Sequence, residues 1–280
     1  MSTNGLPLVS IIIPTYNAGR TLDKCLRSIE GQDYEGKIET IVVDNLSDDN
    51  TKEVAQKFKV RFIEEKCGRS RARNIGAKVA RGKYLLFLDS DMYLSKSVVR
   101  ECVEALEENT RLVALYIPEE IIGGGFWIKV RNFERKFYDM TCIDAVRFIR
   151  ADVFRKVGGF DEKLVGGEDW DLDRRIKRRG ETALIKSPLY HDESKFSISR
   201  YLMKKRLYSD TLAKYVAKWG RDDPIVRKQL GLKYRLIGIF LEGGKWKRFI
   251  KCPHLSFPMI LLRSLVGGIY LITRVAKSKS

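Results

Sequence analysis

The sequence lacks the cysteine patterns of disulfide scaffolds and zinc sites, and it lacks the apolar N-terminal segment of a secretion signal. Its five cysteines are scattered, odd in number and never form a CxxC pair. This argues against a disulfide framework and a zinc site, and it indicates a reducing compartment. The first six residues are too short and polar to form the apolar core of a signal peptide. We therefore expect a cytoplasmic protein, or one at the cytoplasmic face of a membrane.

The basic residues are unevenly distributed along the sequence. The 280 residues carry a formal net charge of +17, from 53 Lys and Arg against 36 Asp and Glu. From Lys195 to Ser280 there are roughly 20 basic and about 4 acidic residues, so about +16 of that charge lies in the tail. We predict a body over residues 1–194 and a basic, amphipathic helical C-terminal region over residues 195–280.

Strand and helix signals alternate through the body at the spacing of α/β proteins. The expected strands cover residues 9–13, 38–43, 60–63, 83–88, 112–117, 147–150 and 183–186. The expected helices cover residues 22–29, 49–58, 70–80, 95–107, 152–157 and 168–179. Successive crossovers imply a largely parallel sheet. The predicted fold class is α/β, with a mostly parallel nucleotide-binding sheet flanked by helices.

Asp89, Ser90 and Asp91 follow the clearest buried strand of the sequence. They fall where open α/β sheets bind ligands, at the carboxyl end of a central strand. Alternate side chains of an extended segment point the same way, so Asp89 and Asp91 can converge on one cation. Two hard oxygen ligands suit Mg²⁺ or Mn²⁺ carrying a diphosphate. Alternatively, these acids only end a strand in a turn.

Other polar segments also end or follow strands. The first consists of Pro14, Thr15, Tyr16 and Asn17, where the backbone must turn out of the sheet. Asp44 ends the next strand and can accept hydrogen bonds from a base or ribose. Arg71 and Arg73 can hold a phosphate or base oxygen through their fork geometry, or they form an exposed helix face.

Glu168 and Asp169 open an expected helix, where the helix dipole stabilises carboxylates without any further function. Two glycines precede them and allow a ligand to approach closely, and Trp170 offers a flat apolar face. One of the two acids can take the proton from an attacking hydroxyl. His191, expected to follow a strand, is either a metal ligand or a polar residue at a strand end.

Together, the segments PTYN, VVDNLSDDNT, GRSRARNIG, GKYLLFLDSD and GGFDEKLVGGEDWDLDRR resemble the inverting, nucleotide-sugar-dependent glycosyltransferases of family 2. The resemblance covers roughly residues 8–192, and the ordered combination is highly specific. It implies a nucleotide-binding α/β sandwich of the GT-A type, with residues 1–194 as the catalytic domain. The donor-binding residues would be Pro14, Thr15, Tyr16, Asn17, Asp44, Arg71, Arg73 and Ser90.

The resemblance also implies individual roles. Asp89 and Asp91 would surround the Mn²⁺ or Mg²⁺ that binds the diphosphate of a UDP- or GDP-sugar. Asp169 would be the general base, and Glu168 its orienting neighbour. His191 sits where many relatives place a further metal or diphosphate ligand.

The sequence departs from the family pattern in two places. Asn45 stands where the family often has a second aspartate, which leaves the identity of the nucleotide open. No QxxRW segment follows Glu168 and Asp169, so we expect transfer of a single sugar rather than processive synthesis. We expect the acceptor side to be lined by Trp170 and by residues 123–127, which include Trp127.

The tail predicts contact with a membrane surface. Several apolar and aromatic residues fall near one helix face: Tyr201, Tyr208, Leu212, Tyr215, Val216 and Trp219. Residues 257–272 are apolar but interrupted by Arg263, Pro258 and two glycines, which favours a helix in the membrane interface over a span. Such a tail would hold the enzyme beside a lipid-linked or glycolipid acceptor. Alternatively, these helices pack on the body and their lysines are only solvated.

Two other classes of function remain open. A nucleotidyltransferase would share the fold and metal site, but no Gly-rich, Lys- or Arg-bearing triphosphate loop follows the first strand. A basic nucleic-acid-binding protein fits the net charge. Against it, the charge lies outside the carboxylate-rich body and no nucleic-acid motif accompanies it, so we expect no nucleic-acid partner.

Overall fold

The computed structural model describes residues 5–278, without the side chains of residues 207–210 and 270–278. The chain forms two compact units. The first comprises Met1–Glu120, Ala145–Glu162 and Glu168–Asp192, and the second Ile121–Asp144, Lys163–Gly167 and Glu193–Ser280. The second unit thus takes segments from the middle of the chain as well as from its end. The charge-based boundary after residue 194 stays a prediction.

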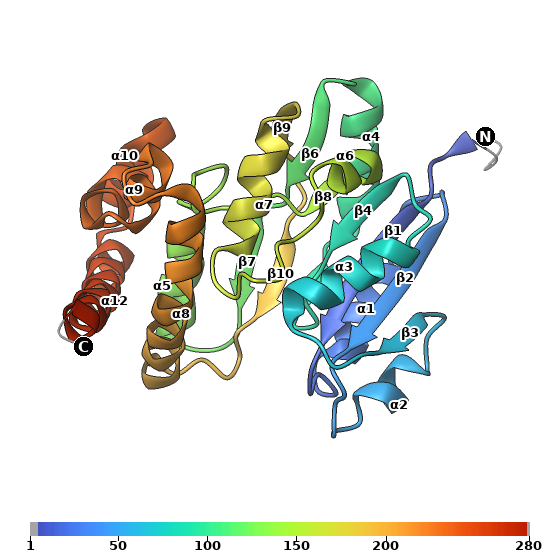
Figure 1. The fold of residues 1–280 in the computed structure, drawn as a ribbon, viewed down its shortest axis with the longest axis horizontal. Coiled ribbons are helices and arrows are strands. Elements are labelled where there is room, and N and C mark those ends of the chain that lie inside the picture. Colours follow the sequence, from blue (N-terminus) through green and yellow to red (C-terminus); the bar gives the residue numbers. More distant parts are fainter. Residues whose placement is uncertain (1–4, 279–280) are drawn as a thin grey trace. The chain divides into compact units, whose positions relative to one another are not determined.

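A seven-stranded sheet of order β3-β2-β1-β4-β8-β6-β9 forms the centre of the first unit (Figure 1). Its strands are β1 (Val9–Thr15), β2 (Ile38–Asp44), β3 (Arg61–Glu64), β4 (Tyr84–Phe87), β6 (Leu112–Tyr116), β8 (Phe148–Arg150) and β9 (Glu181–Leu184). Strand β1 pairs in parallel with β2 and with β4, and β2 with β3. The predicted, mainly parallel α/β sheet is confirmed.

Helices cover both faces of this sheet. They are α1 (Leu22–Glu30), α2 (Thr51–Ala55), α3 (Arg69–Val79), α4 (Val98–Glu108), α6 (Ala151–Lys156) and α7 (Glu168–Lys177). Ile11 and Ile13 of β1 share a core with α1 and α4, whereas Ile12 shares the other core with α3, α6 and α7. This alternation is the period of two expected of a strand. A Cβ on Gly76 of α3 would lie 2.4 Å from Ile12 Cγ2, so glycine allows that helix to pack closely.

The structure departs from the sequence predictions mainly at short elements. Strand β8 is antiparallel to both β4 and β6. A second sheet of order β5-β10-β7 contains β5 (Met92–Leu94) and β7 (Glu119–Ile122), which were not predicted, and β10 (Leu189–Asp192). His191 therefore lies within a strand, and the prediction that it follows one was wrong. These strands have only three or four residues, which is too short for hydrophobic periodicity to detect them.

The second unit is helical. It contains α5 (Phe126–Arg135), α8 (Ile198–Trp219), α9 (Pro224–Leu230), η2 (Tyr234–Gly238), α10 (Ile239–Leu241), η3 (Glu242–Gly244), α11 (Trp246–Lys251) and α12 (Pro253–Ser278). Leu212 and Tyr215 of α8 are buried, and Tyr215 Oη donates a 2.7 Å hydrogen bond to Gln229 Oε1. Among the described residues, no helix combines the length and hydrophobicity that crossing a membrane requires.

Candidate functional site

Asp44 organises a network of hydrogen bonds where β1 and β2 end side by side. Its buried carboxylate accepts hydrogen bonds from Thr15 Oγ1 (2.7 Å), from Ser47 N (2.7 Å) and from Ser47 Oγ (2.6 Å). Ser47 Oγ in turn accepts one from Asn17 N at 2.8 Å. Asp44 therefore shapes the loops that follow both strands, as well as lying at the edge where α/β sheets bind ligands.

Asp89 comes directly after β4 and lies between two guanidinium groups. Its Oδ1 accepts a 2.7 Å hydrogen bond from Arg73 Nη2, and its Oδ2 lies 4.0 Å from Arg147 Nη1. Burial alone would raise the pKa of Asp89, but Arg73 and Arg147 outweigh it and hold this pKa well below its ordinary value. The carboxylate is therefore ionised throughout the neutral range.

Arg73 joins Asp89 to Asp169. Its side chain, on α3, is only 2% exposed, and Nη1 donates a 2.8 Å hydrogen bond to Asp169 Oδ1 in the first turn of α7. Its Nε has no hydrogen-bond partner among the described residues. One guanidinium thus connects the acid at the end of β4 with the acid that opens α7. These two residues are 80 positions apart in the sequence.

Glu168, the neighbour of Asp169, lies in a different environment. It is buried, and Arg69 Nη2 donates a 2.5 Å hydrogen bond to its Oε1. Burial and the adjacent Asp169 raise the pKa of Glu168 to about 7, although Arg69 opposes the shift. By contrast, the side chain of Asp169 is 43% exposed and can be reached by a hydroxyl from solvent.

His191 links Asp91 to a further acid that was not predicted. Its Nε2 lies 3.3 Å from Asp91 Oδ2 and its Nδ1 lies 2.9 Å from Glu119 Oε1. Burial opposes protonation, but hydrogen bonds with Asp91 and Glu119 prevail and raise the pKa of His191 to about 10. Glu119 also pairs with Arg147 at 3.2 Å. At neutral pH the imidazole is therefore a cation held between two carboxylates.

These contacts form one continuous chain of charged groups. In order, it consists of Asp169, Arg73, Asp89, Arg147, Glu119, His191 and Asp91. Sequence reasoning missed the roles of Arg147, Glu119 and Arg69. The sequence signal for these roles was a charged residue near the end of a short strand or helix. This pattern is common on protein surfaces, so it could not identify them.

The remaining predicted residues are more dispersed. Tyr16 is exposed, and Asn17 adopts a left-handed conformation with φ of 49° at the turn after β1. Arg71 does not share the burial of Arg73: it pairs with Glu65 at 3.0 Å, and both of these side chains are exposed. Ser90 is half-buried in the turn after Asp89, and Trp170 is half-buried on α7. Trp127 belongs to α5 of the second unit.

The donor atoms suit a hard divalent cation only in part. Asp89 and Asp91 supply the carboxylates that Mg²⁺ and Mn²⁺ prefer. Within the described part of the chain, however, no three His, Cys, Asp or Glu side chains gather in an arrangement that could hold a metal ion. The residues therefore fit a cation whose other ligands come from a bound diphosphate and water rather than from the protein.

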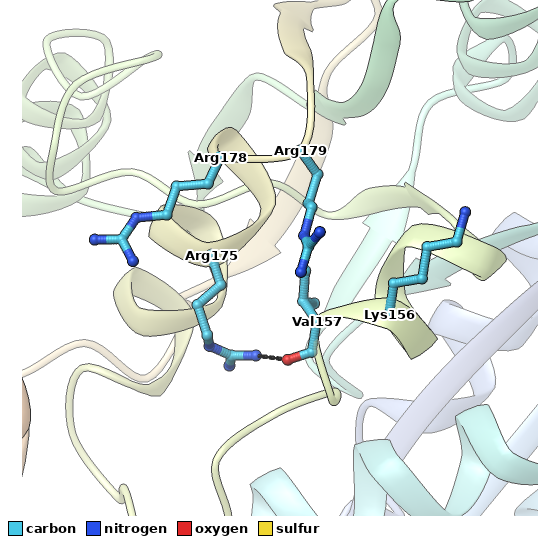
Figure 2. A pocket seen from close by; sticks show the side chains of 5 residues that line it. All are labelled: Lys156, Val157, Arg175, Arg178 and Arg179. Carbon is cyan, nitrogen blue, oxygen red and sulfur yellow. Dashed lines mark hydrogen bonds between the residues drawn. The ribbon is translucent and has the colours of Figure 1, made fainter.

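A hollow of about 230 Å³ lies at the opposite end of α7 from Glu168 and Asp169 (Figure 2). It is lined by Lys156, Val157, Arg175, Arg178 and Arg179. Arg175 is already engaged, because its Nη1 donates to Val157 O at 2.6 Å and its Nη2 to Asp171 Oδ2 at 2.6 Å. Basic residues at a helix C-terminus complement the helix dipole. This hollow is separate from the chain of charged groups.

Comparison with known proteins identifies the class to which this fold and site belong. The model of glycosyl transferase family 2 matches residues 10–161, which is more than half of the chain. The chain belongs to this family. Glycosyltransferase AglE of Haloferax volcanii is 30% identical over 202 residues, which cover 64% of each chain. Glycosyltransferase GlyG of Streptococcus pneumoniae is 32% identical over 132 residues, 44% of each chain. The matched regions thus span less than two thirds of these relatives.

Solved structures show the same fold. The mannosyltransferase PcManGT of Pyrobaculum calidifontis, in complex with GDP-Man and Mn²⁺, superposes with a TM-score of 0.65 at 17% identity, over 98% of this chain and 88% of that one. TarS 1-349 of S. aureus in complex with UDP gives a TM-score of 0.57 at 17% identity, over 97% and 91%. These likenesses identify the GT-A type fold.

Proposed function

We propose that this protein is a metal-dependent, inverting glycosyltransferase that moves a single sugar from a nucleotide-diphospho-sugar to an acceptor hydroxyl. One observation carries the proposal: Arg73 holds Asp89, at the end of β4, and Asp169, at the start of α7, by one guanidinium. A donor-side acid and an acceptor-side acid are thereby kept in a defined relation. Family membership and the donors named for PcManGT (GDP-Man) and TarS (UDP) support a UDP- or GDP-sugar.

The donor side is built from the carboxyl ends of β1, β2 and β4. Asp44 orders the loops that would contact the nucleoside, through its hydrogen bonds with Thr15 and Ser47 and the bond from Asn17 to Ser47. Asp89 and Asp91 would hold Mn²⁺ or Mg²⁺ together with the diphosphate. Bound there, the ion would neutralise the charge that develops on the leaving diphosphate. His191, whose Nε2 lies 3.3 Å from Asp91 Oδ2, would be a further ligand of the metal or of the diphosphate.

On the acceptor side, Asp169 would accept the proton of the attacking hydroxyl. Arg73 orients the partly exposed carboxylate of Asp169, and catalysis by a general base benefits from such a fixed orientation. Attack from the face opposite the diphosphate inverts the anomeric carbon. Buried Glu168 would support the first turn of α7 through Arg69. Trp170, two residues after Glu168, would offer an apolar face to the acceptor.

We further propose that the acceptor is lipid-linked or a glycolipid, at the cytoplasmic face of a membrane. The support is the basic tail, because lysines near an anionic leaflet contribute attraction on the order of 1 kcal/mol each. Membership of family 2 weakens the alternatives of a nucleotidyltransferase and of a nucleic-acid-binding protein.

The test is a thermal-shift titration with UDP, GDP and their sugars, with and without Mn²⁺ or Mg²⁺, alongside donor turnover. We expect one nucleotide to stabilise the protein only when the metal is present. Asp89→Ala should abolish that shift. Asp169→Asn should keep it while turnover falls about 100-fold or more, the loss typical of a missing general base. Near-normal turnover in Asp169→Asn would contradict the assignment of the base.

A further inference from the structure

Helix α12 exposes a stripe of large apolar side chains. Phe257, Leu261 and Leu265 are 77%, 49% and 47% exposed. They are spaced four residues apart, so they lie on one face of the helix. On the opposite face, Met259 and Leu262 are buried within the second unit. Contiguous exposed apolar side chains of this size are uncommon on soluble proteins and mark contact surfaces.

The only charged residue in the described side chains of α12 does not interrupt this stripe. Arg263 is buried, and its Nη1 donates hydrogen bonds to Glu134 Oε1 at 3.1 Å and to Tyr138 Oη at 2.9 Å. Its charge is therefore compensated inside the second unit by α5. In the sequence, Arg263 breaks the apolar run, whereas in the structure it leaves the outer face of the helix apolar.

Helix α11 also exposes large apolar side chains, with positive charge beside them. Trp246 and Ile250, again four residues apart, are both exposed. Lys247 and Lys251 are exposed next to them. Ser256 Oγ donates a 2.7 Å hydrogen bond to Phe249 O, which ties the start of α12 to α11. Apolar side chains flanked by lysines are typical of helices that lie in a membrane interface.

The predicted apolar face of α8 does not form such a surface in its described part. The amphipathic face of α8 was expected to contribute, but Leu212 and Tyr215 are buried by packing inside the second unit. The described side chains of α8 therefore favour packing of its apolar face against protein over contact of that face with a membrane. Other described parts of the tail also expose apolar side chains, namely Met203, Ile225, Leu230, Leu232, Ile237 and Leu241. None of these, however, forms a run of three spaced four residues apart on one helix, as Phe257, Leu261 and Leu265 do.

We propose that the outer faces of α11 and α12 form a docking surface for an anionic lipid bilayer, with both helices lying in the interface. Charge complementarity selects this occupant. A second copy of the chain would instead bring two strongly basic surfaces together, which like charges oppose. The inference rests on the proposed function in one respect: it names the part of the chain that would hold the enzyme beside a membrane acceptor.

The test is flotation of the full chain with vesicles of phosphatidylcholine, with and without about 30% phosphatidylglycerol, at several salt concentrations. We expect binding only with the anionic lipid, and release by salt. Phe257→Glu with Leu261→Glu should lower the partition coefficient at least about tenfold. Lys247→Gln and Lys251→Gln should each lower it about fivefold.

The matched control is Met203→Glu, which alters an equally exposed apolar side chain on α8 and should bind vesicles as the wild type does. Equal loss in this control, or no vesicle binding by the wild type, would overturn the proposal. If the wild type were oligomeric without lipid and the variant Phe257→Glu/Leu261→Glu were monomeric, the surface would instead bind a second copy of the chain. Donor-induced thermal stabilisation should be unchanged in all these variants, so failure of lipid binding is distinguishable from failure of the proposed enzyme function.

Discussion

Replacing Arg73 by methionine tests whether its guanidinium organises the site. Methionine has a similar length and no charge, so the substitution removes both ion pairs with little change in volume. Of its two arginine ion pairs, Asp89 would keep the one with Arg147, at 4.0 Å, and Asp169 would lose the partner that Arg73 provides. The matched control is Arg71→Met, two residues away on the same helix, where an exposed ion pair with Glu65 is removed.

The magnitude follows from burial. Removing one partner of a buried ion pair typically costs about 3–5 kcal/mol. Asp169 is 43% exposed and can be hydrated when Arg73 is absent. We therefore expect a loss at the lower end, about 3 kcal/mol in the free energy of unfolding at pH 7. Exposed pairs contribute about 0–1 kcal/mol, so Arg71→Met should lose at most that amount.

The assay is urea unfolding of the two variants and the wild type between pH 7 and pH 3. Arg73 and Arg147 lower the pKa of Asp89 in the folded protein. Its stabilisation is therefore present above the ordinary aspartate pKa of about 3.9 and is lost as the pH falls through the lowered value. The difference between wild type and Arg73→Met should shrink accordingly in acid. A loss at pH 7 no greater than that of Arg71→Met would refute the reasoning.

Two further predictions concern the acids Asp44 and Glu168. Asp44→Ala removes the acceptor of three hydrogen bonds. It should lower the free energy of unfolding by about 3 kcal/mol and weaken nucleotide binding. The control Asp48→Ala, at an exposed position, should change the free energy of unfolding by less than about 0.5 kcal/mol. Urea unfolding with and without nucleotide measures both. The pKa of Glu168 is raised to about 7, so its contribution to stability should be lost as the pH rises from about 4.5 to 7. In Glu168→Gln, the melting temperature should lack this dependence on pH. If the variant and the wild type had the same pH profile, the raised pKa of Glu168 would be contradicted.

The strongest predictions from sequence were those based on long periodic segments. The strands β1 and β2, each with a run of three or more apolar residues, occur as predicted. So does the helix face of Leu22, Cys25, Leu26 and Ile29. Hydrophobic periodicity identifies such elements because one side of each must be buried. The same signal is absent from β5 and β10, which are short and only partly buried.

By itself, the amino-acid sequence determined the α/β fold class, the ordered motifs of a family 2 glycosyltransferase and the position of acids at strand and helix ends. Only the tertiary structure decided which partners these acids have. Arg73 and Arg71 are two residues apart on one helix, yet one is buried between Asp89 and Asp169 and the other is exposed. Arg263 likewise turns inward to Glu134 and leaves the outer face of α12 apolar. The physical reason is that an ion pair depends on the distance between groups remote in sequence, which local patterns do not encode.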